Sequence, residues 1–339
     1  MSMLIRPATQ KDIADLEYLA NESGVGMTTL PSEKVYLQEK IDVSERSFAR
    51  DTRQPGQETY LLLMEDTERQ VAVGSCAIIA SVGKTKPFYS FRIINLTHTS
   101  QELDKYEPVS VLQMADEYRG ATEIATLYLT PEYRRNGNGR LLSRCRFLYL
   151  AEQPQRFSRL VLAEMRGVQN DQGHSVFWDN LGRHFFNMDF SKADYLSSLG
   201  NYQFIADLMP KYPVYIRLLP EEAQEVIGIT HQATRPALKL LEREGFRFEG
   251  CVDIFDAGPT VHCPLDQIRT VRDSHRSVVS EIIHMEEKGQ QLISNTSAHD
   301  FRCCRGDIAF DKNRNLVLSS QAGNLLQVRP GDSIRSIEF

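Results

Sequence analysis

The stretch TPEYRRNGNGR, residues 130–140, has the residue types and spacing that can bind a diphosphate. Glycine allows unusual backbone angles and close approach to a ligand, and this stretch contains Gly137 and Gly139. If a helix begins there, its first amides have no acceptor within the helix and point at a bound anion. The predicted phosphate-binding residues are Arg134, Arg135, Gly137, Asn138, Gly139 and Arg140.

The neighbouring sequence supplies the elements that would position this loop. The apolar run TEIATLYL (122–129) predicts a strand, Pro131 ends it, and residues 139–153 predict a helix. The common nucleotide motifs do not fit, because the loop lacks the Lys-Ser/Thr of a P-loop and the G-x-G-x-x-G of a dinucleotide fold. A basic turn that contacts only solvent is the alternative interpretation.

The pattern Arg134-x-x-Gly137-x-Gly139 resembles motif A of the GNAT acyltransferases, which follows the fourth strand of that fold. In that superfamily the motif holds the pyrophosphate of coenzyme A. The resemblance implies acyl-CoA as a co-substrate and no permanently bound cofactor. It also implies an α/β (α+β) GNAT fold with a mixed, mostly antiparallel sheet.

The expected order of elements agrees with that fold. Residues 4–9 predict a first strand, and the apolar spacing after Lys11 predicts a helix that ends at Gly24. A second helix is expected from Ser32 to Phe48. The remaining expected elements are strands at 58–66, 70–83, 89–100 and 159–167 and a helix at 175–186.

Residues 1–262 predict one acyltransferase domain with its core at 1–190. The last helix of this core loosely resembles GNAT motif B, and ALKLLEREGF (237–246) resembles it more closely. We therefore expect residues 200–258 to be a degenerate half-repeat, a second GNAT-like half packed on the core. Two unrelated helices that each end at a glycine are the alternative. Short strands and polar turns predict a small β-rich C-terminal domain at 263–339.

Residues 3–262 resemble a narrower family, the bacterial arginine N-succinyltransferases. The resemblance implies transfer of a succinyl group from succinyl-CoA to the α-amine of L-arginine, the first step of the ammonia-producing route from arginine to glutamate and succinate. The runs that carry it are RPAT (6–9), GMTTLP (26–31), LAEMRGV (162–168), FWDNLGRHFFNMDFSKADYL (177–196), FIADLMPKYPVY (204–215), EAQEVIG–TH (222–231) and DIFDAGPT (253–260).

In that family the histidine of a V-I-G-x-x-H run is the proton donor, and the matching residue here is His231, in the run 226–231. The resemblance implies that His231 protonates the departing coenzyme A thiolate, directly or through water. An imidazole suits this role because its unperturbed pKa of about 6.5 leaves both forms accessible near neutral pH. Without the resemblance, a lone histidine would be read as a surface or packing residue.

Leu127 matches the succinyl-CoA contact of the same family, on the strand before the phosphate-binding loop. A leucine side chain carries no chemistry, so we expect a contact through the backbone. A strand that diverges from its neighbour there would leave the N–H groups of 127–129, including that of Leu129, free for the thioester carbonyl and the pantetheine amides. The alternative is that Leu127 only packs in the core.

Succinyl recognition requires a cation, and recognition of a guanidinium requires carboxylates, which can bind it with two hydrogen bonds. For each candidate a solvated or structural role is the alternative. The candidate cations are Arg166, Arg183 and Arg235. The candidate acids are Glu123, Glu164, Asp253 and Asp256.

The composition bounds the class of protein. The 339 residues are 41% hydrophobic and 25% charged, which is ordinary for a soluble globular protein. The net charge of −6 argues against nucleic acid as a partner. No apolar run approaches the roughly 20 residues that span a bilayer. The charged N-terminal segment does not predict a signal peptide, so we expect a cytoplasmic protein without a membrane partner.

The six cysteines form no C-x-x-C pair and are expected to be reduced thiols. A zinc site built from His262, Cys263 and Cys303 or Cys304 lacks the spacing of known zinc motifs, so no metal is expected.

Three other functions compete with arginine succinylation. One is an ornithine-preferring succinyltransferase that uses the same apparatus. Another is a non-catalytic acyl-CoA-binding subunit of a two-subunit enzyme, so the expected assembly is a homo-oligomer or a pair with a paralogous subunit. A protein or peptide acetyltransferase is disfavoured, because no long acidic groove is indicated.

Overall fold

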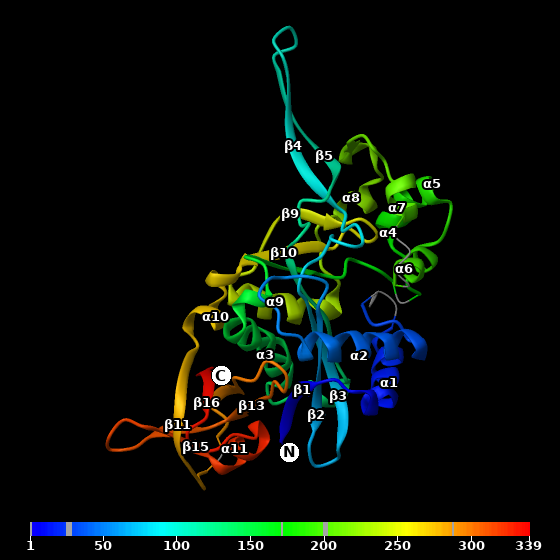
Figure 1. Cartoon of the computed structure of the whole chain (residues 1–339). Helices are drawn as coiled ribbons and strands as arrows, with labels where there is room; N and C mark the ends of the chain where they lie inside the picture. Colours follow the sequence, from blue (N-terminus) through cyan, green and yellow to red (C-terminus); the bar gives the residue numbers. More distant parts are fainter. Residues whose placement is uncertain (1, 25–28, 171, 199–202, 287) are drawn as a thin grey trace.

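The computed structural model describes residues 2–24, 29–170, 172–198, 203–286 and 288–339. Part of the GMTTLP run lies outside these residues. Within them, the strands form one continuous mixed sheet in the order β14-β15-β11-β16-β12-β13-β1-β2-β3-β6-β7-β10-β9-β4-β5-β8 (Figure 1). Among the described strands, only the β6–β7 and β11–β15 pairs are parallel, so the expected mixed, mostly antiparallel sheet is confirmed.

The centre of the sheet has the GNAT arrangement of elements. Its strands are β1 (Met3–Pro7), β2 (Thr59–Asp66), β3 (Val71–Ile79), β6 (Thr122–Leu129), β7 (Leu160–Glu164), β10 (Pro259–Pro264) and β9 (Arg247–Asp253). The central strand β6 is almost entirely buried, which explains why its sequence reads as a continuous apolar run instead of an alternating one.

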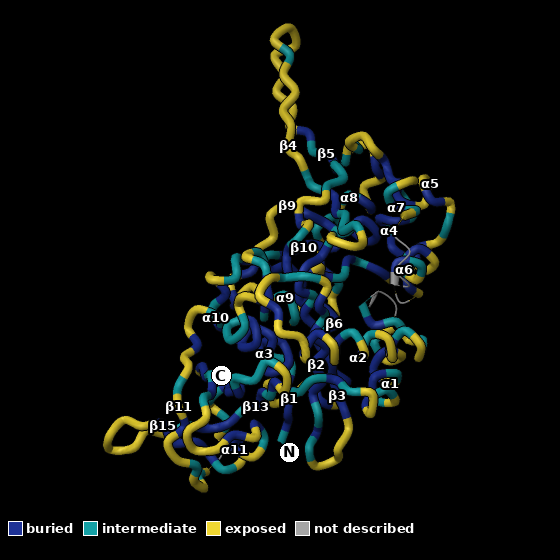
Figure 2. The backbone as a smooth tube through the Cα atoms, viewed as in Figure 1, coloured by how far each residue is buried: buried dark blue, intermediate teal, exposed yellow. Residues whose placement is uncertain are grey.

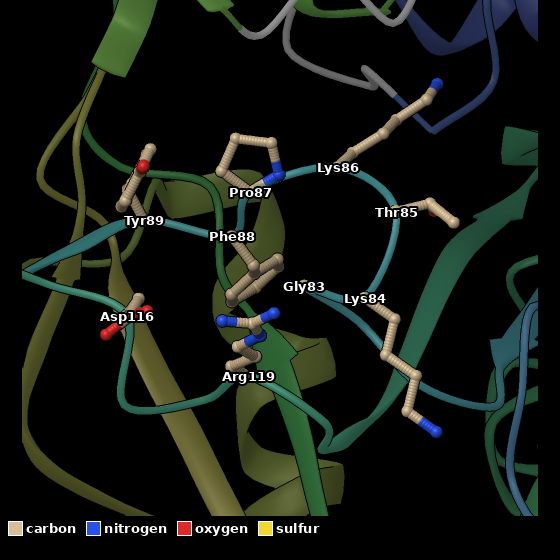
Figure 3. Close-up of a pocket in the computed structure, with 9 residues that line it drawn as sticks. All are labelled: Gly83, Lys84, Thr85, Lys86, Pro87, Phe88, Tyr89, Asp116 and Arg119. Carbon is tan, nitrogen blue, oxygen red and sulfur yellow. The ribbon is translucent and has the colours of Figure 1, made fainter.

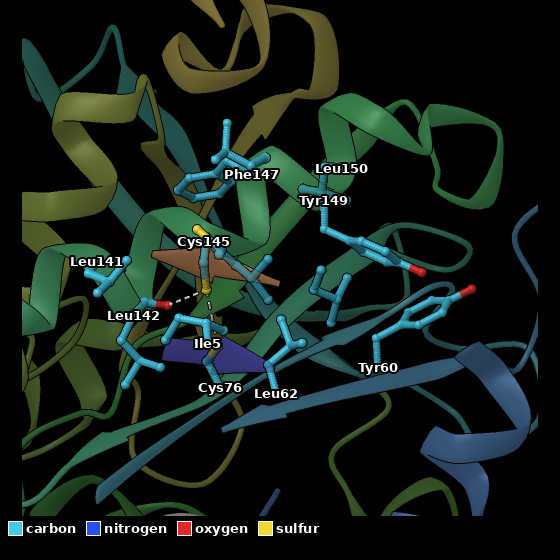
Figure 4. Packing of buried hydrophobic residues seen from close by; sticks show 14 of the residues in the cluster. Ile5, Tyr60, Leu62, Cys76, Leu141, Leu142, Cys145, Phe147, Tyr149 and Leu150 are labelled. Carbon is cyan, nitrogen blue, oxygen red and sulfur yellow. Dashed lines mark hydrogen bonds between the residues drawn. The ribbon is translucent and has the colours of Figure 1, made fainter. Parts of the chain in front are cut away.

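Helices cover both faces of this central part. On one face α1 (Ile13–Ser23) and α2 (Lys34–Ala49) pack through a cluster that includes Leu16 and Leu37. On the other face α3 (Asn138–Glu152) and α9 (Arg235–Glu244) share the largest cluster of buried side chains. Figure 4 shows α3 residues such as Leu142 packed against strand residues of this cluster.

Residues 200–258 do not form the second GNAT-like half that we expected. Strand β9 pairs with β10, and β10 pairs with β7, so these strands complete the first sheet. Helix α9 precedes β9 and packs on α3, with the rings of Phe147 and Phe246 5.8 Å apart. The sequence pattern of ALKLLEREGF was read correctly, but it belongs to the same unit as motif A.

The expected helix at 175–186 is broken into α4 (Val176–Asn180) and α5 (Gly182–Phe186). Leu181 departs from helical geometry, and the ring of Phe186 stacks on Trp178. A Cβ at Gly182 would lie 2.3 Å from the Trp178 ring, so only glycine permits this contact. The two short helices belong to a separate buried cluster beside β4 and β9.

A long hairpin of β4 (Ser90–Ser100) and β5 (Lys105–Ala115) projects from the body of the molecule, and most of its outer part is exposed (Figures 1 and 2). We expected β4 but not β5. Pro108 lies within β5 and argues against a central strand, but it is tolerated here because β5 lies near the edge of the sheet.

The strands of the C-terminal part extend the sheet on its other side, because β13 pairs antiparallel with β1 at Leu4–Cys304. Strand β10 continues to Pro264, so the predicted division after residue 262 falls inside this strand. The division into two domains stays a prediction. The C-terminal elements are β11 (His275–Ile283), β12 (Gln291–Asn295), β13 (Cys303–Gly306), β14 (Ile308–Phe310), β15 (Leu316–Ser319), α11 (Ser320–Leu326) and β16 (Ser333–Glu338).

The other elements are α6 (Phe190–Ser198), α7 (Gln203–Leu208), β8 (Val214–Tyr215), α8 (Glu221–Glu225) and α10 (Arg269–Asp273). In the described part of the chain, no helix combines the length and apolar character that a membrane span requires.

Candidate active site

Strands β6 and β7 pair only at their beginning and then diverge. The parallel register joins Thr122 to Val161 and Glu123 to Leu162 and extends no further. A β-bulge in β6 accompanies the divergence, because Thr126 has a φ of 57° and the β3–β6 register shifts beside it. We call the gap beyond Glu123 the β6–β7 opening.

The backbone of Leu127 and Leu129 faces this opening. The Thr130 N–H donates to the Val73 carbonyl oxygen at 3.0 Å, and alternate residues of an antiparallel strand point to the same neighbour. Tyr128 therefore faces β3, as its pairing with Ser75 indicates. The N–H groups of Leu127 and Leu129 point to the side on which the β6–β7 ladder has ended.

The geometry of Leu127 is compatible with both roles considered for it. Its side chain packs against the main core cluster, while its N–H lies on an unpaired strand edge. Leu129 is buried, and its carbonyl oxygen accepts a 2.8 Å hydrogen bond from Nε of Arg134. Of the three N–H groups at 127–129, those of Leu127 and Leu129 therefore have no strand partner on the β7 side.

Residues 134–140, which we call the diphosphate loop because the sequence predicts that they bind that group, include part of the β6–α3 connection and the first residues of α3. Gly137 has a φ of 78°, as expected for a glycine in the left-handed region, and Asn136 is left-handed as well. Gly139 does not have a positive φ, contrary to our expectation of unusual angles at both glycines. A Cβ at Gly139 would meet nothing within 4 Å, so this residue borders open space.

The start of α3 presents unpaired donors. The Leu141 N–H donates to the Gly137 carbonyl oxygen and the Asn138 N–H to that of Arg135. The N–H groups of Gly139 and Arg140 donate no hydrogen bond within the described residues. These two amides can therefore bind an anion, as the sequence predicts.

The side chains predicted to bind phosphate have different roles. Asn138 is buried and donates to the Tyr133 carbonyl oxygen at 3.1 Å, so its side chain closes the loop. Arg134 turns back toward β6, whereas Arg135 is exposed. The guanidinium of Arg140 lies 3.9 Å from the centre of the Phe339 ring.

His231 begins the short turn that leads into α9. Its N–H donates a 2.8 Å hydrogen bond to the carbonyl oxygen of Arg166, just after β7. Its Nδ1 accepts from the Ala233 N–H at 3.2 Å, which leaves Nε2 to carry a proton. This backbone hydrogen bond therefore fixes His231, which precedes α9, to the segment just after β7.

Four carboxylates, Glu123, Glu164, Asp253 and Asp256, form an acidic cluster beside the opening. Asp256 binds the N–H groups of Gly167 and Gly258 at 2.8 and 2.9 Å, and Asp253 accepts from the N–H of Asp256 at 2.9 Å. These hydrogen bonds hold the segment after β7 against the turn after β9. Asp253 and Asp256 therefore have structural roles.

The side chains of Glu164 and Glu123 form no hydrogen bond or ion pair with the rest of the described chain. Glu164 reaches solvent, yet desolvation and the charges of Asp253 and Glu123 raise its pKa well above the usual range. Partial contact with solvent and a raised pKa are both expected of a carboxylate such as Glu164 if it lines a cleft. Burial raises the pKa of Glu123 to about 7, against the opposing effect of Lys40 on α2.

Few cations balance this cluster. Burial lowers the pKa of Lys40 to about 8. Arg166 is half-buried and donates to Oε1 of Gln169 at 2.9 Å. Arg183 is engaged elsewhere, in ion pairs with acids on and after α4, and Arg235 is exposed. Among the three candidate cations, Arg166 is the one beside both His231 and the acidic cluster.

A separate small cavity of about 210 Å³ lies in the loop between β3 and β4 (Figure 3). Residues 83–89, Asp116 and Arg119 line it. None of the predicted site residues reaches it, and it is smaller than the usual ligand pocket of roughly 300–1,000 Å³.

The histidine and the cysteines considered for a zinc site have other surroundings. Nδ1 of His262 lies 2.8 Å from the Tyr118 hydroxyl, and the six cysteines are buried and form no disulfide. Within the described ranges, no three His, Cys, Asp or Glu side chains are grouped to hold a metal ion.

The order of elements, the bulged strand, the opening beside it and the loop leading into α3 define the GNAT class of acyltransferase folds. The chain belongs to the arginine N-succinyltransferase family. The family described as arginine N-succinyltransferase beta subunit matches residues 3–270, and its C-terminal domain matches residues 274–338.

Known proteins resemble this chain over nearly its whole length. It is 42% identical to the arginine N-succinyltransferase of Yersinia pestis (strain Pestoides F), covering 99% of this chain and 98% of the relative. It is 40% identical to that of Salmonella schwarzengrund (strain CVM19633), with coverage of 99% and 97%. The solved structure of arginine/ornithine succinyltransferase subunit AI from Pseudomonas aeruginosa superposes with a TM-score of 0.90 at 34% identity, covering 99% and 98%.

Proposed function

We propose that this protein is an arginine N-succinyltransferase, which transfers the succinyl group of succinyl-CoA to the α-amine of L-arginine. One observation carries the proposal. In a chain of this family, β6 and β7 diverge beyond Glu123, which leaves the Leu127 N–H on an unpaired strand edge, and the His231 N–H is held by the Arg166 carbonyl oxygen just after β7.

Succinyl-CoA would bind along β6 and the diphosphate loop. The amides of Gly139 and Arg140 are suited to the diphosphate, and those of Leu127 and Leu129 to the pantetheine arm and the thioester carbonyl. Amine attack on the thioester forms a tetrahedral oxyanion, which a backbone N–H would stabilise by donating a hydrogen bond to it. No permanent cofactor or metal takes part in this mechanism.

The acidic cluster is suited to the acceptor substrate. Glu164 has no partner in the described chain and lies among other carboxylates, so a guanidinium would relieve their repulsion. Glu123, with a pKa of about 7, can accept the proton of the attacking amine. Leu127 is four positions after Glu123 on β6, at most roughly 13 Å between Cα atoms, so this proton would pass through water.

His231 would then protonate the departing thiolate from Nε2, because Nδ1 is held by the Ala233 N–H. Arg166, whose carbonyl oxygen holds the His231 N–H, is our candidate for the terminal carboxylate of the succinyl group. This arrangement requires no covalent intermediate on the enzyme. We further propose that the protein works in the cytoplasm, as a homo-oligomer or with a paralogous subunit.

Ornithine is the second candidate acceptor. The name of the Pseudomonas aeruginosa relative includes ornithine, and a carboxylate cluster can bind an ammonium as well as a guanidinium. A planar guanidinium forms two parallel hydrogen bonds with one carboxylate, whereas an ammonium acts as a point charge. We therefore expect arginine to be preferred.

A thiol-release assay tests the function. Purified protein is supplied with succinyl-CoA or acetyl-CoA and with arginine, ornithine or lysine, and free thiol and acylated product are measured. We expect release with succinyl-CoA that depends on arginine. No arginine-dependent release, with the protein alone or mixed with a paralogous subunit, would favour the non-catalytic alternative.

A further inference from the structure

Two guanidinium groups from distant parts of the chain stack on one aromatic ring. Arg140, in the first turn of α3, lies 3.9 Å from the centre of the Phe339 ring. Arg305, on β13, lies 4.3 Å from the same centre. The ring follows β16, so the C-terminal strands meet the diphosphate loop at this point.

The C-terminal strands also contact the backbone of the loop. Nη1 of Arg305 donates to the carbonyl oxygen of Asn136 at 2.6 Å. A Cβ built on Gly137 would lie 2.9 Å from the Phe339 ring. Asn136 and Gly137 are the two left-handed residues of the loop, so these contacts are made where its conformation is least ordinary.

Hydrogen bonds within the C-terminal strands fix Arg305 and Phe339 in place. Nε and Nη2 of Arg305 both donate to the Gly289 carbonyl oxygen, at 3.1 and 2.9 Å. The carboxylate of Asp307 accepts from the N–H of Gly289 at 2.7 Å, and the Phe339 N–H donates to the Gln290 carbonyl oxygen at 2.8 Å. Phe339 and Arg305 are therefore both held by hydrogen bonds to the turn that contains Gly289 and Gln290, and both contact the loop from there.

Several hydrogen-bond donors where the C-terminal strands meet the diphosphate loop have no acceptor within the described residues. The Arg140 side chain forms no hydrogen bond or ion pair within the described residues, and its Nε is buried. The adjoining N–H groups of Gly139 and Arg140 are unpaired there as well. Burial, and then the nearby Arg140 charge, lowers the pKa of Arg305. An anion bound between these groups would accept hydrogen bonds from the unpaired donors and would reduce the repulsion between the Arg140 and Arg305 charges.

We propose that the C-terminal strands are part of the coenzyme site. Arg305 and Phe339 are positioning residues that hold the diphosphate loop in its binding conformation and aim the Arg140 guanidinium at the phosphates of coenzyme A. This inference rests on the proposed function, since it names a further part of the same acyl-CoA site. It gives the C-terminal strands a purpose that their sequence does not indicate.

The test is a calorimetric titration of full-length variants with coenzyme A. Arg305→Gln and Phe339→Leu should each raise the Kd about tenfold or more, since each removes a cation–π contact and loosens the loop. Phe339→Tyr keeps the ring and should bind as the wild type does. Arg329→Gln and Phe310→Leu change exposed side chains of the same strands and turns and serve as matched controls.

Steady-state kinetics separate positioning from general destabilisation. The KM for succinyl-CoA should rise in parallel with the Kd, while kcat and the KM for arginine stay within a factor of about 3 of the wild-type values. A fall in kcat without a change in coenzyme affinity would overturn the proposal. So would wild-type affinity in either Arg305→Gln or Phe339→Leu when that variant is folded.

Hydrogen exchange of the wild-type protein provides a test that does not depend on variants. Coenzyme A should slow exchange in residues 134–140 and also in 303–306 and 333–339. Protection of the loop alone would overturn the inference and leave the proposed function standing. If the wild-type protein binds no coenzyme A at all, the proposed function fails first.

Discussion

The N–H of His231 donates a 2.8 Å hydrogen bond to the carbonyl oxygen of Arg166. Because the β6–β7 register joins Glu123 to Leu162, a continuation of that register would bring Leu127 level with Arg166. We therefore expect His231 to lie across the opening from Leu127. A proton donor and an oxyanion-binding amide would face the same thioester from opposite sides.

This relationship predicts separate catalytic and structural effects at position 231. His231→Ala should lower kcat about 100-fold or more because the thiolate loses its proton donor, with little change in the Kd for coenzyme A. It should also lower the free energy of unfolding by about 1 kcal/mol, because Nδ1 accepts the Ala233 N–H at the start of the turn. His231→Asn retains an acceptor there and should recover stability but not turnover. Recovery of turnover by asparagine would contradict the proton-donor role.

A backbone contact at Leu127 predicts tolerance of a shorter side chain. Leu127→Ala removes a partly buried side chain and should cost about 2 kcal/mol of stability. Its amide remains, so kcat at saturating succinyl-CoA should stay within a factor of about 3. Steady-state kinetics and thermal unfolding measure the two effects. A large loss of kcat in a folded variant would assign the leucine side chain a role that we do not expect.

The two glycines of the diphosphate loop should respond differently. Gly139→Leu adds a side chain to open space and should weaken coenzyme A binding while leaving the midpoint of thermal unfolding nearly unchanged. Gly137→Ala should destabilise the fold by about 1 kcal/mol, because the residue has a positive φ and lies against Phe339. Equal coenzyme affinity in wild type and Gly139→Leu is the result that this account cannot accommodate.

Glu123 predicts a pH dependence with a definite sign. Its pKa is raised to about 7 in the folded protein, so the folded state binds a proton more strongly than the unfolded state does between about pH 4.3 and 7. Stability contributed by this group is present below pH 4.3 and lost as the pH rises through 7. Glu123→Gln should therefore be more stable than the wild type at pH 8, by up to about 3 kcal/mol, and show a smaller difference at pH 5.

The same carboxylate should control activity in the opposite direction. As a base it must be ionised, so kcat/KM should fall as the pH drops through about 7. Glu123→Gln should lower kcat/KM about 100-fold and remove this limb of the profile. An unchanged acid limb in the glutamine variant would assign the titration to another group.

Glu164 predicts an effect on one substrate only. Glu164→Gln keeps the size of the side chain and removes its charge, so the KM for arginine should rise about tenfold or more while the KM for succinyl-CoA stays constant. Glu249→Gln, a change at an exposed acid on β9, is the control. If both KM values rise together in the Glu164 variant, its role is structural.

Sequence patterns predicted the features of the fold and of the site that depend on residues close together in the chain. The spacing of Gly137 and Gly139 between an apolar strand and a helix indicated the diphosphate loop, and the resemblance indicated Leu127 and His231. The pattern of α9 was also visible, but its unit was assigned wrongly, because only the pairing of β10 with β7 shows which sheet it joins.

The rest depends on contacts between distant segments. Nothing near Lys40 in the sequence indicates Glu123, and nothing near Arg305 or Phe339 indicates the loop at 134–140. The bulge at Thr126 arises from the register between β3 and β6, which a single strand does not encode. Strand β5 was missed because Pro108 is informative only when the position of its strand in the sheet is known.

A crystal structure with coenzyme A and N-succinylarginine bound would test the central claim most directly. The account predicts the diphosphate within hydrogen-bond distance of the Gly139 and Arg140 amides, and the thiol in the β6–β7 opening between Leu127 and His231. A coenzyme bound outside the opening, with these amides contacting only solvent, would contradict it.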